Sequence, residues 1–223
     1  MKEFSARKFG AGVVGLLGAM MLLAGPAHAA GGGLREGVDY ARIGAAQPQS
    51  GPGIEVVEFF SYGCPHCNDF EPVVSRWRAA LPKDVTFKRI PISFGNPKWV
   101  ALSKLYLALE NLGETGKLHR DIFAAVHARN SPLVDEKTIL DWASSRVADQ
   151  KKFLDMYRSF DVQAKQQRSE QLGAAFGIPA VPSMAVGGRY LVLAEDAKSF
   201  DDLLRVTDQV IDKARRESKP GAR

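Results

Sequence analysis

Apolar residues form short continuous runs in the first part and near the end of the chain, which predicts strands there. The run 54–60 carries valine and phenylalanine on both faces, as expected of a strand covered on two sides. A second core strand is predicted at 85–92 and a short edge strand at 38–43. Two further runs, 183–186 and 189–192, flank a Gly-Gly pair, which signals a tight hairpin.

In the middle of the chain the apolar spacing changes to a helical period. Helices are predicted around the apolar residues of 102–112, 118–126, 139–143, 153–157 and 162–176. Gly113 and Gly177 are expected to end the first and the last of these helices, because glycine adopts the left-handed conformation at little cost. Asp135 is expected to cap the third.

Two more helices flank this helical region. A helix predicted at 68–80 contains Pro72, which is expected to kink it. The last helix follows Ser199 and Asp202, a pair that resembles a capping box. The order of elements is therefore βαβ, a helical insertion of about 80 residues, and ββα, which is an α/β arrangement.

The N-terminal segment has the features of a secretory signal. Basic residues within 2–8 precede an apolar stretch, 11–24, that is too short to span a bilayer comfortably. The small residues Ala27 and Ala29 then form a cleavage site, so removal after Ala29 is expected. An uncleaved membrane anchor is the alternative. Cleavage would leave about 190 residues, enough for one domain or for a core with one large insertion.

Charge adds little to this picture. The formal net charge is +5, and part of the basic excess lies in the signal segment. The remaining basic residues are scattered and are not interleaved with aromatic residues, so nucleic-acid binding is not predicted. The densest basic run, 213–223, is interpreted as a solvated chain end.

The chain contains two cysteines, Cys64 and Cys67, placed between the strand at 54–60 and the following helix. A bridge between them closes a very small loop and would stabilise the fold little. Residues three apart at a helix start are nevertheless close enough to form a disulfide. Because export implies an oxidising compartment, the pair is interpreted as a redox-active disulfide.

The spacing assigns different roles to the two sulfurs. Cys64 lies at the helix start, where free N–H groups and the helix dipole favour a thiolate. A lower Cys64 pKa stabilises the reduced form and makes the disulfide more oxidising. Cys67 lies one turn deeper and is expected to be the resolving thiol. Pro65 suits the first helical turn, and a protonated His66 would lower the Cys64 pKa further; alternatively, His66 is an exposed residue without a role.

The segment 58–67, Glu-Phe-Phe-Ser-Tyr-Gly-Cys-Pro-His-Cys, resembles the active-site segment of the DsbA family of periplasmic thiol:disulfide interchange proteins. The helical insertion and the export signal match that family, and the resemblance covers essentially the whole mature chain. It implies a thioredoxin-like core from 30–94 and 177–216. The resemblance also implies a helical domain inserted at 95–176, and a flexible tail is expected at 217–223.

The resemblance implies a cis-proline loop that faces the dithiol. Pro179 and Pro182 are both candidates, and Pro182 fits better because it directly precedes the strand at 183–186. The backbone of Val181 could then pair with a substrate peptide as an added strand. Pro179 is interpreted as a residue that stiffens the loop.

The resemblance also implies a proton shuttle for Cys67. Glu58 matches a buried acid behind the cysteines, and Lys88 matches a basic residue near it. Two alternatives stay open: Glu58 is only a structural ion-pair partner, and Lys88 is a solvated strand residue.

No metal and no cofactor are predicted. His119 and His127 are expected on solvated helix faces. A zinc site needs about four ligands, which two cysteines and His66 do not provide. A glycine-rich phosphate loop is not evident in the sequence.

The resemblance therefore implies a monomeric periplasmic oxidase that donates the Cys64–Cys67 disulfide to unfolded exported polypeptides with free thiols. It also implies reoxidation by a DsbB-type quinone-linked membrane oxidase. A shallow apolar groove near Tyr62, Pro182 and the helical insertion is expected to hold peptides loosely. One alternative is a disulfide isomerase or reductase of the same fold, although an N-terminal dimerisation domain has no room before residue 54. A peptide-binding chaperone with an idle dithiol is the other.

Overall fold

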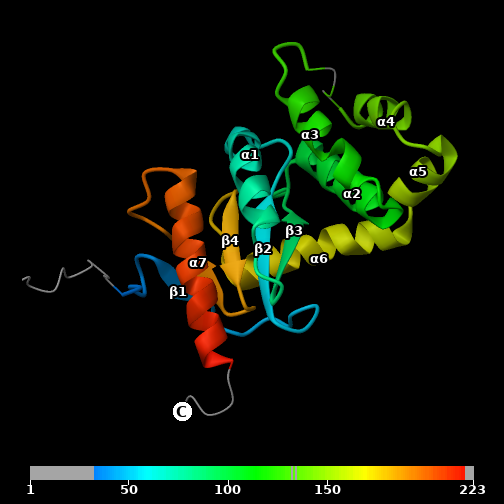
Figure 1. Cartoon of the computed structure of the whole chain (residues 1–223). Coiled ribbons are helices and arrows are strands. Elements are labelled where there is room, and N and C mark those ends of the chain that lie inside the picture. Colours follow the sequence, from blue (N-terminus) through cyan, green and yellow to red (C-terminus); the bar gives the residue numbers. More distant parts are fainter. Residues whose placement is uncertain (1–32, 132, 134, 219–223) are drawn as a thin grey trace, which may run out of the picture. The chain divides into compact units, whose positions relative to one another are not determined.

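The computed structural model of the chain describes residues 33–131, 133 and 135–218 (Figure 1). The described residues from Leu34 to residue 218 form one compact unit. The signal segment expected at 1–29 lies outside the described residues, as do residues 219–223 of the expected tail.

The described residues contain one five-stranded mixed sheet in the order β1-β5-β4-β2-β3. Its strands are β1 (Tyr40–Arg42), β2 (Ile54–Phe60), β3 (Val85–Pro91), β4 (Ser183–Val186) and β5 (Tyr190–Val192). The predicted strands are thus confirmed, with boundaries that differ by up to two residues. Strand β2 runs parallel to β3 and antiparallel to β4, so it lies inside the sheet.

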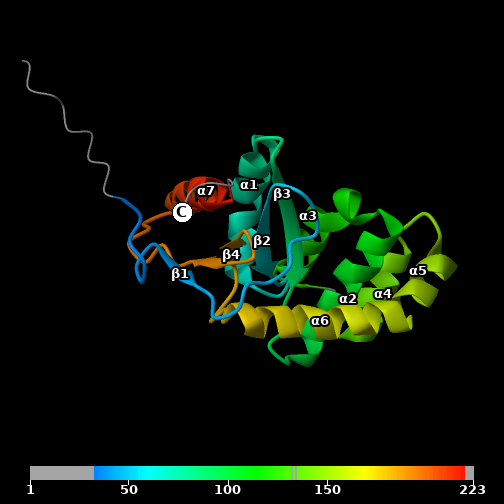
Figure 2. The same cartoon turned by 90° about the horizontal axis from the view of Figure 1, so that it is seen from below.

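Helices cover both faces of β2, which explains why all seven of its residues are buried. Helices α1 (Pro65–Ala79) and α7 (Phe200–Glu217) lie on one face, and α6 (Phe160–Phe176) lies on the other (Figure 2). On the first face Val56 packs in one apolar cluster with residues of α1 and α7. On the second face the ring of Phe59 contacts that of Phe176, with centroids 5.2 Å apart.

Five helices lie between β3 and β4 in the described residues, as the sequence predicts. They are α2 (Pro97–Leu112), α3 (Thr115–Val126), α4 (Glu136–Ser144), α5 (Gln150–Tyr157) and α6. Gly113 and Gly177 end α2 and α6 in the left-handed conformation, with φ of 71° and 66°. The carboxylate of Asp135 accepts a hydrogen bond from the backbone of Thr138 and caps α4. These caps were all expected from the sequence.

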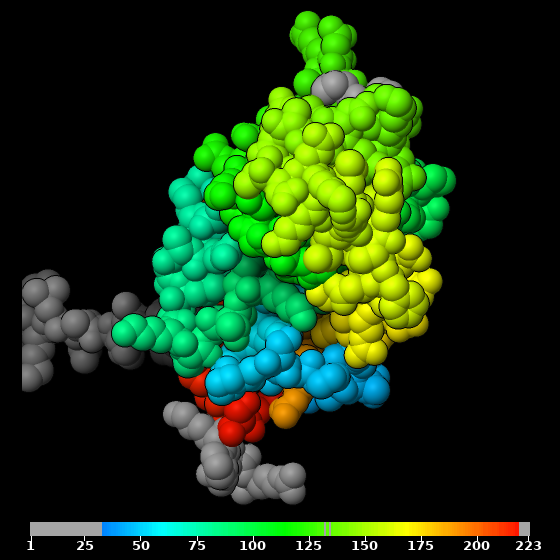
Figure 3. All heavy atoms as spheres, turned by 90° about the vertical axis from the view of Figure 1, so that its right-hand side faces the viewer, coloured from blue at the N-terminus to red at the C-terminus, as the bar shows by residue number. Residues whose placement is uncertain are grey.

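The insertion and the sheet share one apolar core. Buried residues of α2, α3, α4, α5 and α6 belong to the same cluster as Phe60, Tyr62 and both cysteines. The dithiol therefore lies where the core of the insertion meets the end of the central strand. Figure 3 shows the side of the molecule on which α5 and α6 (yellow-green and yellow) lie above the light-blue segment that leads into β2.

Two helix boundaries differ from the sequence prediction. Helix α1 begins at Pro65 instead of Asn68, because Cys64 is extended and serves as the N-cap while Pro65 takes the first helical position. Helix α7 includes Glu217, which the sequence places in the tail. The Glu217 carboxylate accepts a hydrogen bond from Tyr190 of β5, which holds the last turn on the sheet, and another from Lys213 within the helix. Within the described part of the chain, every helix is too short or too polar to cross a membrane.

Candidate active site

Cys64 and Cys67 are free thiols at the start of α1. Cys64 directly follows the loop after β2, and its backbone N–H donates to the Ser61 carbonyl over 3.1 Å. Its side chain is 5% exposed, and that of Cys67 is fully buried. Cys67 is therefore the deeper of the two, as the spacing predicts. Pro65 and His66 between them are exposed.

The two thiols have opposite acidities. The pKa of Cys64 is lowered to about 6, first by a hydrogen bond from the Cys67 thiol, and this effect outweighs burial. The backbone N–H groups of Cys67 and His66 lower it further, and the charge of His66 adds to them. Burial is the main cause of the raised pKa of Cys67, and its hydrogen bond to Cys64 raises that pKa further. Near neutral pH the reduced site therefore carries one thiolate, on Cys64.

The loop before β4 faces this thiolate. The Val181–Pro182 peptide bond is cis, as predicted for Pro182 in preference to Pro179. The Cys64 Sγ lies 3.2 Å from the Val181 carbonyl oxygen, which can accept a hydrogen bond from the thiol form. The backbone of Val181 and the reactive sulfur are thus direct neighbours, although they are far apart in the sequence.

A hollow of about 540 Å³ lies beside Pro182. Its walls include Met184 of β4 and Phe200 and Leu203 of α7. The groove expected from the sequence was wrong about Tyr62. Tyr62 is only 1% exposed and therefore cannot line a groove, whereas Pro182 does line this hollow.

Glu58 of β2 is buried behind the site, as expected, but its partner is Arg89 and not Lys88. The Arg89 Nε donates to Glu58 Oε2 over 2.8 Å. In the β2–β3 register Glu58 lies opposite Arg89, and Lys88 lies opposite Val57. Because side chains alternate along a strand, Lys88 points to the other face of the sheet. There it lines a different hollow of about 490 Å³, and its Nζ donates to Ser50.

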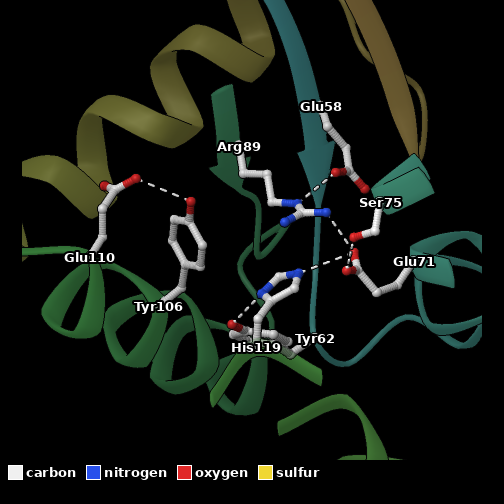
Figure 4. A network of polar contacts seen from close by, with 8 residues as sticks. All are labelled: Glu58, Tyr62, Glu71, Ser75, Arg89, Tyr106, Glu110 and His119. Carbon is white, nitrogen blue, oxygen red and sulfur yellow. Dashed lines mark hydrogen bonds and ion pairs between the residues drawn. The ribbon is translucent and has the colours of Figure 1, made fainter. Parts of the chain in front are cut away.

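Arg89 begins a buried network that the sequence did not reveal (Figure 4). Its Nη2 donates to Glu71 Oε2 over 2.6 Å. The same oxygen lies 3.2 Å from His119 Nε2, and His119 Nδ1 lies 2.7 Å from the hydroxyl of Tyr62. The network therefore connects β2, β3, α1 and α3 with the loop that carries Tyr62.

His119 of α3 and His127, which caps its C-terminus, were both wrongly expected on solvated helix faces. His119 is 5% exposed, and the half-buried His127 places Nε2 at 2.9 Å from the Tyr62 carbonyl oxygen. The periodicity contains the signal that was missed. His119 is followed at helical spacing by Ile122, Phe123 and Val126, all of them buried, so it lies on the apolar face of α3.

The acids of the network differ in their pKa values. Burial raises the pKa of Glu58, and the charge and hydrogen bond of Arg89 offset only part of this effect. Burial acts on Glu71 in the same direction, but hydrogen bonding from His119 and the charge of Arg89 outweigh it and lower its pKa. Burial lowers the pKa of His119, so its ring is neutral near neutral pH.

A tryptophan of the insertion packs directly against the residue before the nucleophile. A Cβ added to Gly63 would lie 2.2 Å from the Trp99 indole nitrogen. Gly63 thus lets α2 approach the active-site loop, and the spacing of apolar residues gave no sign of this contact. Across the described residues, no cluster of three or more His, Cys, Asp or Glu side chains could hold a metal ion.

These features define a class of protein. A thiolate-forming cysteine caps the helix that follows a central strand, a second thiol lies one turn deeper, and a cis-proline loop faces them on a thioredoxin-like core. Thiol:disulfide oxidoreductases combine a low-pKa cysteine with a Cys-X-X-Cys pair in this way.

Comparisons with known proteins lead to a particular family. The model of the DSBA-like thioredoxin domain matches residues 55–206. The thiol:disulfide interchange protein DsbA of Bordetella parapertussis is 41% identical over 181 residues, which cover 79% of this chain and 85% of that protein. The DsbA of Pseudomonas aeruginosa is 35% identical over 184 residues, which cover 82% of this chain and 87% of that protein.

Solved structures agree. The crystal structure of Pseudomonas aeruginosa DsbA has a TM-score of 0.75 at 34% identity and covers 82% of this chain and 95% of that chain. The oxidoreductase DsbA from Xylella fastidiosa also has a TM-score of 0.75, at 28% identity, and covers 82% of this chain and 98% of that one. The chain therefore belongs to the family of DsbA-like thioredoxin domains, and it is a thiol:disulfide oxidoreductase.

Proposed function

We propose that the chain is a disulfide donor that oxidises pairs of thiols in newly exported, unfolded polypeptides. The observation that carries this proposal is the low pKa of Cys64 beside the high pKa of Cys67. Thiolate stabilisation acts only on the reduced form, because the disulfide has no charge. A low Cys64 pKa therefore makes the Cys64–Cys67 disulfide a stronger oxidant.

The reaction follows from this difference in acidity. A substrate thiolate attacks the Cys64 Sγ, a new disulfide forms there, and the Cys64–Cys67 bond breaks with its electron pair on Cys67. The Cys67 sulfur takes up a proton, because its pKa is high. A second substrate thiolate then attacks the substrate sulfur, and Cys64 leaves as a stable thiolate. The substrate loses two electrons and the enzyme gains them.

Neighbouring residues support these steps. Glu58 is the proposed source of the proton. Burial raises the pKa of Glu58, and its negative charge when ionised raises the pKa of Cys67. Arg89 takes the position of the basic partner that the resemblance assigns to Lys88. Pro182 and Val181 present backbone next to the Cys64 sulfur, where an extended substrate peptide can pair. Pro65 and His66 are proposed to set the geometry and charge of the helix start.

The partners and the compartment are proposed from family membership. The named DsbA relatives support exported, thiol-containing polypeptides as substrates and the periplasm as the working location. The reduced enzyme has to be reoxidised, and a DsbB-type quinone-linked membrane oxidase is the proposed partner. A monomer is proposed, and no cofactor beyond the dithiol itself enters the reaction.

Equilibration with glutathione buffers tests the direction of electron flow. A reduction potential of about −120 mV, the known value for a strongly oxidising DsbA, supports a donor. A potential below about −250 mV, in the range of thioredoxin-type reductants, would contradict the donor role. A chaperone with an idle dithiol should keep its activity when Cys64→Ser is introduced, whereas the donor should lose oxidase activity completely.

A further inference from the structure

The two buried acids of the network in Figure 4 are held very differently. Three donors surround the Glu71 carboxylate: Ser75 Oγ at 2.5 Å, Arg89 Nη2 at 2.6 Å and His119 Nε2 at 3.2 Å. Among the described residues, the Glu58 carboxylate has a hydrogen bond from Arg89 alone. Hydrogen bonds to a carboxylate favour its charged form, so the geometry favours ionisation of Glu71 over that of Glu58.

The orientation of the His119 ring completes this arrangement. A neutral imidazole has one N–H, and the partner of the other nitrogen decides where the proton lies. Burial raises the pKa of Tyr62 well above its ordinary value, so its hydroxyl keeps its proton. That hydroxyl can donate to His119 Nδ1 over 2.7 Å, which leaves the proton on Nε2, facing Glu71.

We propose that His119 of the helical insertion is a positioning residue for the redox reaction. It donates to Glu71, keeps that acid ionised, and thereby leaves Glu58 as the acid that exchanges a proton with Cys67. This inference rests on the role proposed above for Glu58. It also gives the insertion a part in the chemistry, because α3 supplies the donor that distinguishes the two acids.

Electrostatics explains why one donor matters. Two carboxylates share one guanidinium, so one negative charge in the pair has no cationic partner of its own. Like charges at this depth raise each other's pKa, and the acid with fewer donors takes the proton first. Without the His119 donor, the pKa of Glu71 should rise. Protonation of Glu71 would remove its repulsion from Glu58 and free Arg89 for Glu58, so the pKa of Glu58 should fall.

Other charged and titratable groups face the acids from every surrounding element. They are Arg78 on α1, Arg89 on β3, Tyr106 and Glu110 on α2, His119 and Arg120 on α3, and Tyr62 and Cys67 beside them. A polar cavity of about 360 Å³ reaches Glu71, Arg89 and His119 from the surface. Protons can therefore exchange between the network and water at its Glu71 end.

The test is an NMR titration of carbon-13-labelled glutamate side chains in the full-length oxidised protein, in which no thiol titrates. In the unmodified protein Glu58 should titrate at higher pH than Glu71. In His119→Phe the Glu71 pKa should rise by about one unit, the size expected for a lost hydrogen bond to a charged group. The Glu58 pKa should fall at the same time.

Two variants separate this role from a structural one. His119→Gln places an amide N–H where it can donate to Glu71, so it should restore the original order of the two titrations. Tyr106→Phe removes a hydroxyl from the same cavity without contacting either acid and should leave both titrations unchanged. An unchanged Glu58 titration in folded His119→Phe overturns the proposal.

A measurement on the unmodified protein covers the case in which His119→Phe does not fold. Nitrogen-15 shifts report which ring nitrogen of His119 carries the proton. Protonation on Nε2 with a neutral ring supports the proposal, whereas a proton on Nδ1 or a charged ring near neutral pH overturns it. Neither reading depends on the reduction potential, so failure of the disulfide-donor function would be recognised separately.

Discussion

The Nε of Arg89 donates to the Oε2 of Glu58 over 2.8 Å between two adjacent parallel strands, where the two side chains are 7% and 2% exposed. The pair lies directly behind the reactive cysteines. At this depth a carboxylate is costly unless a cation accompanies it. Arg89 accompanies two of them, and charge balance in the core therefore depends on this one guanidinium.

Replacement of Arg89 by Met should destabilise the protein strongly. The change leaves Glu58 and Glu71 buried without a cation, and breaking a buried pair in this way costs about 3–5 kcal/mol. Urea denaturation of the oxidised protein near neutral pH measures the loss. Both acids become easier to protonate in the variant, so the deficit should shrink as pH falls.

Lys88→Met is the matched control for this prediction. Lys88 is the neighbouring residue on β3, but it is exposed and bonded to Ser50 across the other face of the sheet. Its replacement should change the free energy of unfolding by no more than about 0.5 kcal/mol. Equal losses in the two variants would contradict the assignment of Arg89 as the partner of Glu58.

Ultraviolet absorbance of the thiolate should show one titration in the reduced protein, with a midpoint near the Cys64 pKa of about 6. Cys64→Ser should abolish it, because the remaining Cys67 has a raised pKa. His66→Ala should shift the midpoint upward only slightly, since the Cys67 thiol and the backbone N–H groups contribute more. A midpoint near the ordinary cysteine value would refute this account.

The same pKa makes the stability of the reduced form depend on pH. In the unfolded chain the Cys64 thiol keeps its ordinary pKa of 9.0, and in the folded chain its pKa is about 6. Between these values the unfolded state binds more protons, so the stability of the reduced protein rises with pH. The Cys64 thiolate's contribution to the free energy of unfolding, which the oxidised protein lacks, should disappear as pH falls through about 6. Parallel denaturant titrations of both forms across this window would reveal the difference.

Gly63→Ala should disturb the contact between the active-site loop and α2. The new methyl group would overlap the Trp99 indole at 2.2 Å, so the ring or the loop has to move. Overpacking of this kind costs about 1–3 kcal/mol, and the fluorescence of Trp99 should change with it. Gly116→Ala on α3 is the control, because its Cβ meets nothing within 4 Å. Unchanged stability in Gly63→Ala would show that the contact is looser than the structure indicates.

The Gly187–Gly188 hairpin should tolerate asparagine at one position and not at the other. Both residues have positive φ, 62° and 64°, which asparagine adopts more readily than most residues. A Cβ at Gly187 makes ordinary contact with Ala214 at 3.4 Å, whereas one at Gly188 would lie 2.1 Å from the Gln47 carbonyl oxygen. Gly188→Asn should therefore lower the melting temperature clearly more than Gly187→Asn. Similar losses would exclude this backbone clash as the cause.

Local signals in the sequence predicted much of the fold. The strand at Ile54–Phe60, the hairpin, and the helix caps at Asp135, Gly113 and Gly177 all depend on residues within a few positions of each other. The dithiol could also be predicted from the sequence, because both cysteines and the helix start that activates Cys64 lie in one short segment.

Errors in the site came from residues whose meaning depends on a distant partner. Lys88 and Arg89 are adjacent cations on one strand, and only pairing with β2 decides which of them faces Glu58. A shift of one residue exchanges the two faces of the sheet, so sequence alone could not choose between them. His119 is a different case: the helical spacing of buried residues in α3 already indicated its buried face, and only its partners Tyr62 and Glu71 required the tertiary structure.

The sequence by itself determined the reactive pair and the order of the elements, because local backbone preferences and spacing encode these features. The cis-proline loop was implied by the family resemblance, and its position before the strand at 183–186 favoured Pro182. Tertiary structure alone decided how the site is charged. Burial raises the pKa of Cys67, Arg89 joins Glu58 to Glu71, and an insertion helix brings His119 to the rear of the dithiol. Desolvation and hydrogen bonding act through space, and they are therefore defined only when separate segments pack against one another.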